Sequence, residues 1–544
     1  MASAHRNILF IMCDQLRFDY LSCAGHKTLQ TPNIDALAAR GVRFSNAYVQ
    51  SPICGPSRMS FYTGRYMSSH GATANFVPLR VGERNIGDHL RPLGVRPVLV
   101  GKTHMMADRE GMARLGVDPE SQIGVHYREA GFEPYERDDG VYPDKMMKSQ
   151  PRYNDYLREK GHEGANPWHW AANAVQTPDG VRSGFYNDIA DLPANLAEED
   201  SETPYMTRRA MEFLAEDDGQ SPWLLHLSYI KPHWPYIAPA PYNAMFGPDD
   251  LQAPIRSEAE LADPNPLMKH FIDRIAGRTF GRDEAIEKVV PTYMGLIKQI
   301  DDQLGALFAF MEARGMMDNT TIMLTSDHGD YLGDHWMGDK DYFHDPSVKV
   351  PLIIADPDAS ADATRGTVCD ALVQGIDLLP TFIEHFGGTP PGHQLDGVSL
   401  LPLLRGQAAT VNEFVVSEYD YHQQVFAPET KRGPRDCRIY MLATEDWKYI
   451  HAPGFAPVLF DRKADPEEFN DLGRSPDHEA VRRQMHTRLA EWALQYRQRE
   501  TYSDEMAAKF TAFEEKAGVL IGYWDEDDLI DPANAPRQQD QTGP

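Results

Sequence analysis

Short apolar runs, each ending in polar residues, are the feature that most constrains the fold of this chain. Residues 7–12, 98–100, 223–230 and 321–324 are such runs. A short continuous apolar run is typical of a strand buried on both faces in a parallel sheet. Residues 293–314 instead place their apolar side chains on one helical face, which predicts a helix packed on the core. We therefore expect strands and helices to alternate around a parallel sheet.

Residues suited to chemistry follow each of these runs. In open α/β sheets, ligands bind at the carboxyl ends of the strands. The candidates at the four strand ends are, in chain order, Asp14 and Gln15, Lys102 and His104, His233, and Asp327 and His328. An adjacent Asp and His at a strand exit would make half of a metal site, and Lys340 follows in a polar loop. Taken singly, each residue also has a structural reading, as a capping aspartate, a surface lysine or a hydrogen-bonded histidine.

Residues 52–64, PICGPSRMSFYTG, contain one cysteine close to a proline and an arginine. Pro56 suits the first turn of a helix, and Gly64 would end that helix. Cys54 would then face free N–H groups and the positive end of the helix dipole, with Arg58 one turn further on. Such a place stabilises an anion. The structural alternative is a buried cysteine beside a turn.

An anion site in this chain would be a local basic pocket in an acidic protein. The formal charge is −28, from 53 basic and 81 acidic residues, which argues against nucleic acid or an anionic membrane as partner. The five cysteines, at positions 13, 23, 54, 369 and 437, have neither the spacing of a zinc site nor the even number of a disulfide framework. The first residues lack a signal-peptide pattern, and no segment approaches the ~18 apolar residues of a membrane span. We expect a cytoplasmic protein.

Composition divides the chain into three predicted parts. Residues 1–410 would form a catalytic α/β domain, with a loop-rich insertion at about 110–215 that shapes access to the substrate. Short strands separated by turns predict a smaller C-terminal α+β domain over 411–500, built on an antiparallel sheet. Residues 501–544 would be an arm or tail. Its aromatic residues indicate an arm that docks on a second copy in a homo-oligomer, and a solvated tail is the alternative.

The run around Cys54 resembles the sulfatase signature, in which the cysteine of C-x-P-S-R is oxidised to formylglycine. Only Tyr62 departs from that pattern. Related pieces follow in the family's order, ending with the WKYI and LFDRKADPEEFNDL runs of the C-terminal domain. The resemblance implies the α/β/α sandwich of the alkaline phosphatase superfamily, with a smaller C-terminal domain on a short antiparallel sheet. It also implies one divalent ion held by Asp14, the modified Cys54, Asp327 and His328.

The same resemblance implies roles for the other candidates. Those that would bind the substrate are Gln15, Asn75 and Lys102. Those that would act in catalysis are Cys54, Arg58, His104, His233 and Lys340. A formylglycine-generating enzyme would make the nucleophile from Cys54, and its hydrate would attack sulfur or phosphorus in line. His233 or Lys340 would then protonate or offset the leaving alcohol.

Two departures from the common sulfatase pattern bear on the metal and the substrate. Gln15 stands where many sulfatases have a second Asp, and His328 where many have Asn. Fewer carboxylates and an added imidazole favour Mn²⁺ over Ca²⁺, and both changes match the phosphonate monoester hydrolase branch. Lys102 and His104 match the sulfatases, where the phosphonate enzymes have neutral hydroxyl residues.

The predicted function is therefore hydrolysis of small anionic esters of the arylsulfatase type, that is, sulfate monoesters. Phosphonate monoesters and phosphodiesters would be additional substrates. One alternative is a phosphonate monoester hydrolase or phosphodiesterase. The other is a non-catalytic anion-binding scaffold with an unmodified cysteine.

Overall fold

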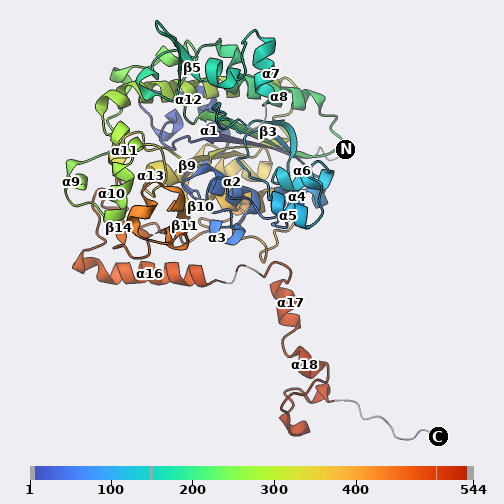
Figure 1. Cartoon of the computed structure of the whole chain (residues 1–544). Coiled ribbons are helices and arrows are strands. Elements are labelled where there is room, and N and C mark those ends of the chain that lie inside the picture. Colours follow the sequence, from blue (N-terminus) through green and yellow to red (C-terminus); the bar gives the residue numbers. More distant parts are fainter. Residues whose placement is uncertain (1–5, 148–150, 496, 498, 536–544) are drawn as a thin grey trace.

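The computed structural model describes residues 6–147, 151–495, 497 and 499–535. These residues form a body with a central sheet covered by helices, and a second, smaller sheet at one side (Figure 1). Beyond the small sheet the chain leaves the body as an arm that carries α17 (Asp504–Lys509) and α18 (Phe513–Lys516) (Figure 1). Within the described residues, none of the helices has both the length and the apolar character that a membrane span requires.

The central sheet has eight strands in the order β10-β2-β9-β8-β1-β7-β3-β4. Their bounds are β1 (Asn7–Asp14), β2 (Val42–Tyr48), β3 (Arg96–Gly101), β4 (Glu133–Arg137), β7 (Trp223–Pro232), β8 (Thr320–Ser326), β9 (Lys349–Ala355) and β10 (Thr367–Gln374). Strand β1 pairs in parallel with β7 and β8, and β9 alone among the eight runs against its neighbours. The four strands predicted from apolar runs are confirmed, and they occupy the middle of the sheet.

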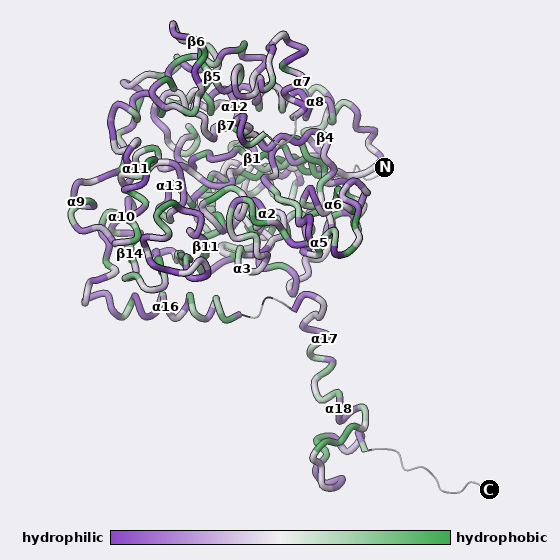
Figure 2. The backbone as a smooth tube through the Cα atoms, viewed as in Figure 1, coloured by the Kyte–Doolittle hydropathy of each residue, from purple (hydrophilic) through white to green (hydrophobic). Residues whose placement is uncertain are grey.

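Both faces of the central sheet are buried. Along β1, Ile8, Phe10 and Met12 belong to one hydrophobic core, and Leu9, Ile11 and Cys13 belong to the other. The helices that pack in the first core include α2 (Cys54–Thr63) and α14 (Leu378–His385). Those in the second are α1 (Pro32–Arg40), α8 (Glu202–Glu216) and α12 (Asp283–Glu312). Hydrophobic stretches accordingly gather in the middle of the body (Figure 2).

Two regions contain more regular structure than predicted. Helix α12 begins at Asp283, ten residues before the predicted start, because it continues through Pro291 in its first three turns. The stretch of about 110–215 is not only loops, since β4 joins the edge of the sheet and α8 packs against β7 and α12. In both regions the elements are partly exposed, and polar residues alternate with apolar ones. A search for continuous apolar runs therefore does not detect them.

The small sheet is antiparallel throughout, in the order β11-β12-β13-β14. Its strands are β11 (Val415–Asp420), β12 (Arg438–Ala443), β13 (Trp447–His451) and β14 (Val458–Asp461). One face joins the first core of the body, and α16 (Glu479–Leu494) covers the other face with Met485, Leu489 and Trp492. The predicted α/β fold with a smaller C-terminal antiparallel sheet is confirmed. The bounds set for the three parts of the chain stay a prediction.

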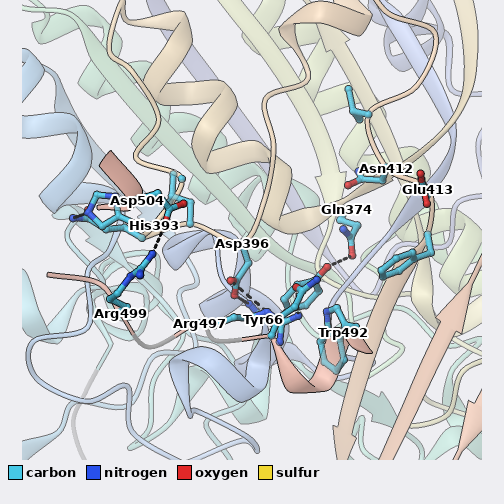
Figure 3. A pocket seen from close by; sticks show the side chains of 16 residues that line it. Tyr66, Gln374, His393, Asp396, Asn412, Glu413, Trp492, Arg497, Arg499 and Asp504 are labelled. Carbon is cyan, nitrogen blue, oxygen red and sulfur yellow. Dashed lines mark hydrogen bonds and ion pairs between the residues drawn. The ribbon is translucent and has the colours of Figure 1, made fainter. Parts of the chain in front are cut away.

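The start of the arm is fixed to the body beside a cavity of about 520 Å³ (Figure 3). The guanidinium of Arg497 lies over the rings of Trp492 and Tyr66, at 4.5 and 5.2 Å from their centroids. It also lies 3.6 Å from the carboxylate of Asp396. Because these three partners come from the small domain and the body, the arm leaves from a defined point.

Candidate active site

Four potential ligands converge at one edge of the central sheet. They are carboxylate oxygens of Asp14 and Asp327, the Sγ of Cys54 and a ring nitrogen of His328, all buried and all within 4.8 Å of one another. The register explains the meeting of the two carboxylates. Strands β1 and β8 pair Cys13 with Ser326. The residues that follow, Asp14 and Asp327, therefore lie side by side at the same edge of the sheet.

Cys54 is the first residue of α2, as predicted, and Gly64 ends this helix with a left-handed φ of +65°. The backbone N–H of Gly55 donates to Asn75 Oδ1 at 2.9 Å. A Cβ at position 55 would lie only 2.9 Å from that oxygen, so a larger residue there would displace the Asn75 side chain. Asn75 thus satisfies a free N–H group at the helix start as well as lining the cavity described below.

The surroundings of Cys54 stabilise negative charge. Its Sγ lies 3.1 Å from His328 Nε2, 3.3 Å from Lys340 Nζ and 3.7 Å from Asp14 Oδ1. Burial alone would raise the pKa of the thiol, but Lys102, Lys340, His328 and a hydrogen bond with His104 hold it well below its usual value. An anion at this position is therefore favoured.

Arg58 is fully buried and supports the carboxylates. Its Nε donates to Asp327 Oδ2 at 2.7 Å, and its Nη2 lies 3.3 Å from Asp14 Oδ2. Its Nη1 donates to the Lys102 carbonyl and to Ser228 Oγ, at 2.9 and 2.8 Å. With every side-chain nitrogen engaged, Arg58 holds the two aspartates rather than lining the cavity.

Lys102 lies between Asp14 and the open cavity. Its Nζ is 2.5 Å from Asp14 Oδ2. Burial and Cys54 both act to raise the pKa of Asp14, yet Lys102, His233 and Arg58 bring it below its usual value. Asp14 is therefore ionised and available as a ligand across the physiological pH range.

His233 and Lys340 form a directed pair. His233 Nδ1 is 2.6 Å from the Trp234 carbonyl oxygen, so Nδ1 carries the proton and Nε2 is left to accept from Lys340 Nζ at 3.0 Å. Burial and the charge of Lys340 lower the pKa of His233. Lys340 is thus the proton-bearing member, because burial would lower its pKa but Cys54 and Asp339 raise it.

Gln15 anchors Lys340 from within the protein. Its Oε1 accepts from Lys340 Nζ at 2.9 Å, and its Nε2 donates to Asp330 Oδ2 at 2.5 Å. Tyr236 also donates to that carboxylate, at 2.6 Å. Burial and Asp339 raise the pKa of Asp330 to about 6. Asp330 and Tyr236 were missed from the sequence, although Asp330 closes the Ser326–Asp330 run that includes two predicted ligands.

A third missed residue, Asp139, positions His104. Its Oδ1 accepts the backbone N–H groups of Thr103 and His104 at 3.0 and 2.9 Å. This clamp holds His104 at a left-handed φ of +53°, with its side chain in the cavity wall. Asp139 belongs to the predicted loop-rich insertion, where no motif distinguishes it from its acidic neighbours.

A cavity of about 490 Å³ opens onto this cluster. Of the predicted residues, those in its wall are Cys54, Asn75, Lys102, His104, His233 and Lys340. The same wall carries the apolar side chains of Phe76, Met105, Met106 and Trp234. The cavity thus combines lysine and histidine side chains with apolar ones, as an ester with an anionic head and an organic body requires.

Comparison of the chain with known families shows which protein family it belongs to. A sequence model of the family described as Sulfatase matches residues 6–388, well over half of the chain. The chain belongs to the sulfatase family. A second family model, described as "N-sulphoglucosamine sulphohydrolase, C-terminal", matches residues 333–495 of this sulfatase. The resemblance drawn from the cysteine signature is confirmed.

This sulfatase is similar to characterised and solved proteins along most of its length. It is 34% identical over 524 residues to the "Multifunctional alkaline phosphatase superfamily protein PehA" of Trinickia caryophylli, covering 91% of this chain and 96% of that protein. An arylsulfatase of Clostridium perfringens is 25% identical over 495 residues, covering 87% and 91%. The phosphonate monoester hydrolase of Agrobacterium radiobacter matches with a TM-score of 0.78 at 29% identity, covering 90% and 95%.

Membership of the sulfatase family implies a metal ion and a formylglycine, and the residues present fit both. The donors are two carboxylates, one imidazole and the side chain of residue 54. His328 Nδ1 donates to the Gly329 carbonyl at 2.9 Å, which turns Nε2 toward the cluster. Burial lowers the pKa of His328 but Asp327 raises it further, to about 9, so a bound cation would displace the Nε2 proton.

Proposed function

We propose that this sulfatase hydrolyses sulfate monoesters of the arylsulfatase type, and that it also accepts phosphonate monoesters and phosphodiesters. The observation that carries the proposal is the place of Cys54. It lies at a helix N-terminus, beside three other metal-type ligands, with Lys102, Lys340, His104 and His233 around the adjoining cavity.

Each residue then has a role that follows from its contacts. Asp14, Asp327, His328 and residue 54 hold the ion, which when bound supplies Lewis acidity to the nucleophile and the anion. Lys102 and His104 bind the oxygens of the substrate's anionic group. Lys340 delivers a proton to the leaving oxygen, and His233 with Gln15 positions that proton.

For the metal we propose Mn²⁺ rather than Ca²⁺. The donor set includes the imidazole of His328, and Gln15 uses its side-chain oxygen on Lys340 rather than on the cluster. Two carboxylates and a nitrogen suit a transition-type ion better than the all-oxygen cage that calcium prefers.

Phosphonate monoester or phosphodiester hydrolysis is the second candidate for the main activity. Similarity to the Agrobacterium radiobacter phosphonate monoester hydrolase supports it. A variant of Lys102 distinguishes this candidate activity from sulfate monoester hydrolysis. A sulfate monoester presents three equivalent oxygens and a phosphonate monoester only two, so a cation at the third oxygen matters more for sulfate. We expect Lys102→Ala to reduce kcat/KM for aryl sulfates far more than for aryl phosphonates. Equal losses would favour the second candidate.

The direct test of the proposal is the chemical state of residue 54. Peptide mass spectrometry of the mature protein should find a peptide that has lost H₂S and gained O relative to the thiol form. Assays with aryl sulfates and aryl phosphonates should then show turnover that depends on the metal. A free thiol in protein made beside the converting enzyme, with no turnover of either ester, would leave only the non-catalytic scaffold.

Two partners belong to this proposal. One is the formylglycine-generating enzyme, which would act in the cytoplasm, where we place this protein. The other is a second copy of the chain. The arm exposes Trp524 at 90%, Ile530 at 81% and Ile521 at 79%, and such apolar side chains are rarely left in water together. We propose that the arm docks on a neighbouring subunit in a homo-oligomer.

A further inference from the structure

We infer that the leaving group of the ester binds in a second hollow beside the catalytic cavity, and that this hollow takes aromatic or extended apolar groups. The inference rests on the proposed function, because it assigns a place to the organic part of the same substrate. We call the hollow the leaving-group groove. Its apolar side chains include those of Phe185, Tyr186, Trp234 and Ile275.

The leaving-group groove adjoins the catalytic cavity. It has a volume of about 550 Å³ and shares Trp234 and Asp339 with the catalytic cavity. The indole N–H of Trp234 donates to Asp339 Oδ1 at 3.2 Å, which fixes the ring at the boundary. The ring of Phe185 lies 6.0 Å from that of Trp234 and continues the aromatic wall outward.

The position of the proton donor gives the groove its role. Lys340 and His233 contact each other and must both lie near the leaving oxygen when it accepts a proton. Trp234 follows His233 and Asp339 precedes Lys340 in the chain, so the boundary residues of the groove flank the donor pair. The first carbon of the leaving group therefore enters the groove, while the nucleophile attacks from the opposite side.

The lining of the groove determines which leaving groups it favours. Tyr186 is 62% exposed and Ile275 is 75% exposed, so both offer apolar surface that a ligand would cover. Among the described residues of its wall there is no lysine, arginine or histidine, and the charged members are Asp188 and Asp339. A neutral aromatic group gains from this wall, whereas a leaving group with further sulfates would be repelled.

A part of the catalytic cavity that the groove does not share is suited to a different part of the substrate. Phe76 and Met106 line the cavity but not the groove, and the ring of Phe76 lies 6.1 Å from that of His104. A sulfate monoester has no second organic group to place there, but a phosphonate monoester or phosphodiester has one. Changes in the leaving-group groove should therefore act on the leaving group alone.

The experiment compares two aryl sulfates whose leaving phenols have nearly equal acidity, phenyl sulfate and 4-biphenylyl sulfate, with the matching phenylphosphonates run in parallel. The full-length, metal-loaded enzyme should prefer the biphenylyl ester in kcat/KM. Tyr186→Ala and Ile275→Ser should each lower that preference about fivefold, mainly through KM, as expected for the loss of part of one apolar side chain. Ile123→Ser, which removes an exposed apolar residue of α6 (Gln122–Arg128), is the matched control and should keep the preference.

Each result decides something different. A lower preference in both groove variants, with the control unchanged, supports the inference. An unchanged preference in both overturns it and leaves the proposed function standing. Ile275 also lines the adjoining hollow beside His270 and Phe426. The inference is therefore also overturned if Val425→Ser, in that hollow, loses the preference while Tyr186→Ala keeps it. If the enzyme cleaves neither ester type, the proposed function itself fails.

Discussion

At the scale of single residues, the hydrogen-bond directions around Lys340 support its proposed role as the donor of the leaving-group proton. His233 accepts at Nε2, and Gln15 accepts at its side-chain oxygen, so both neighbours leave the charge on Lys340. The sequence cannot predict either direction, because each depends on a second contact. His233 also contacts the Trp234 carbonyl, and Gln15 also donates to Asp330.

Lys340→Ala should slow esters of weakly acidic phenols by about 10²–10³-fold, the usual contribution of a general acid. Esters of strongly acidic phenols need little protonation and should lose much less. The measurement is the dependence of kcat/KM on the pKa of the leaving phenol, which should become steeper in the variant. Lys463→Ala, at an exposed lysine of the C-terminal domain, is the control. An equal loss for all esters would contradict proton donation.

Tyr62, the one departure from the signature, is a packing residue. Its hydroxyl lies 2.9 Å from His226 Nε2, in the core between α2 and β7. Burial and Arg58 lower the pKa of His226 to about 3, so the ring is neutral and suits a buried pair. The signature could predict Cys54 and Arg58 because both contact the cluster of potential ligands, whereas the role of Tyr62 depends on a partner 164 positions away.

At the scale of elements, the sequence predicted the strands whose residues are buried throughout. Strands β1, β7 and β8 have this pattern. Strands β2 and β10 mix buried with partly exposed positions, and β10 lies at the edge of the sheet, so they lack a continuous apolar run. Asp14, Asp327 and His328 could be predicted as candidate ligands because they lie at the ends of central strands. The supporting Asp139 could not, because it follows edge strand β4.

One buried carboxylate on β11 should make stability depend on pH. Glu418 Oε2 accepts the Ser68 backbone N–H at 2.9 Å, while Oε1 has no hydrogen-bond partner among the described residues. Burial raises the pKa of Glu418 from 4.5 to about 7. The folded state therefore holds this proton more tightly than the unfolded state, and its stabilising contribution is present below pH 4.5 and lost as the pH rises toward 7.

Glu418→Gln should remove this dependence, because glutamine has nearly the same shape and no charge. The wild-type free energy of unfolding should fall between pH 5 and 8 relative to the variant, by up to about 3 kcal/mol. Urea denaturation across that range measures it. Parallel curves for the two proteins would show that Glu418 is ionised in the fold throughout. Glu445→Gln, at an exposed glutamate of the same domain, is the matched control.

At the scale of the whole molecule, the arm is the segment that leaves the body with apolar side chains uncovered. It departs from the point fixed by Arg497 and runs away from the central sheet (Figure 1). Its exposed tryptophan and isoleucines therefore depend on another molecule for burial.

Sedimentation tests the proposed docking of the arm. The full chain should sediment as an oligomer, and a chain truncated after Arg499 should sediment as a monomer. Because truncation also removes Glu500, which pairs with Arg65 at 2.7 Å, a second variant keeps the full arm and carries only Ile521→Ser and Trp524→Ser. It should also dissociate. A monomeric full-length protein would contradict the proposal.

The enclosure of Cys54, only 1% exposed within a helix whose residues are all buried, has a consequence for the timing of maturation. The proposed converting enzyme would have to reach the Cys54 side chain, which the folded protein buries. We therefore expect conversion to precede folding, on the newly made chain. Protein purified from a host without that activity should resist later treatment in vitro until it is unfolded, whereas a peptide of residues 48–66 should be converted at once.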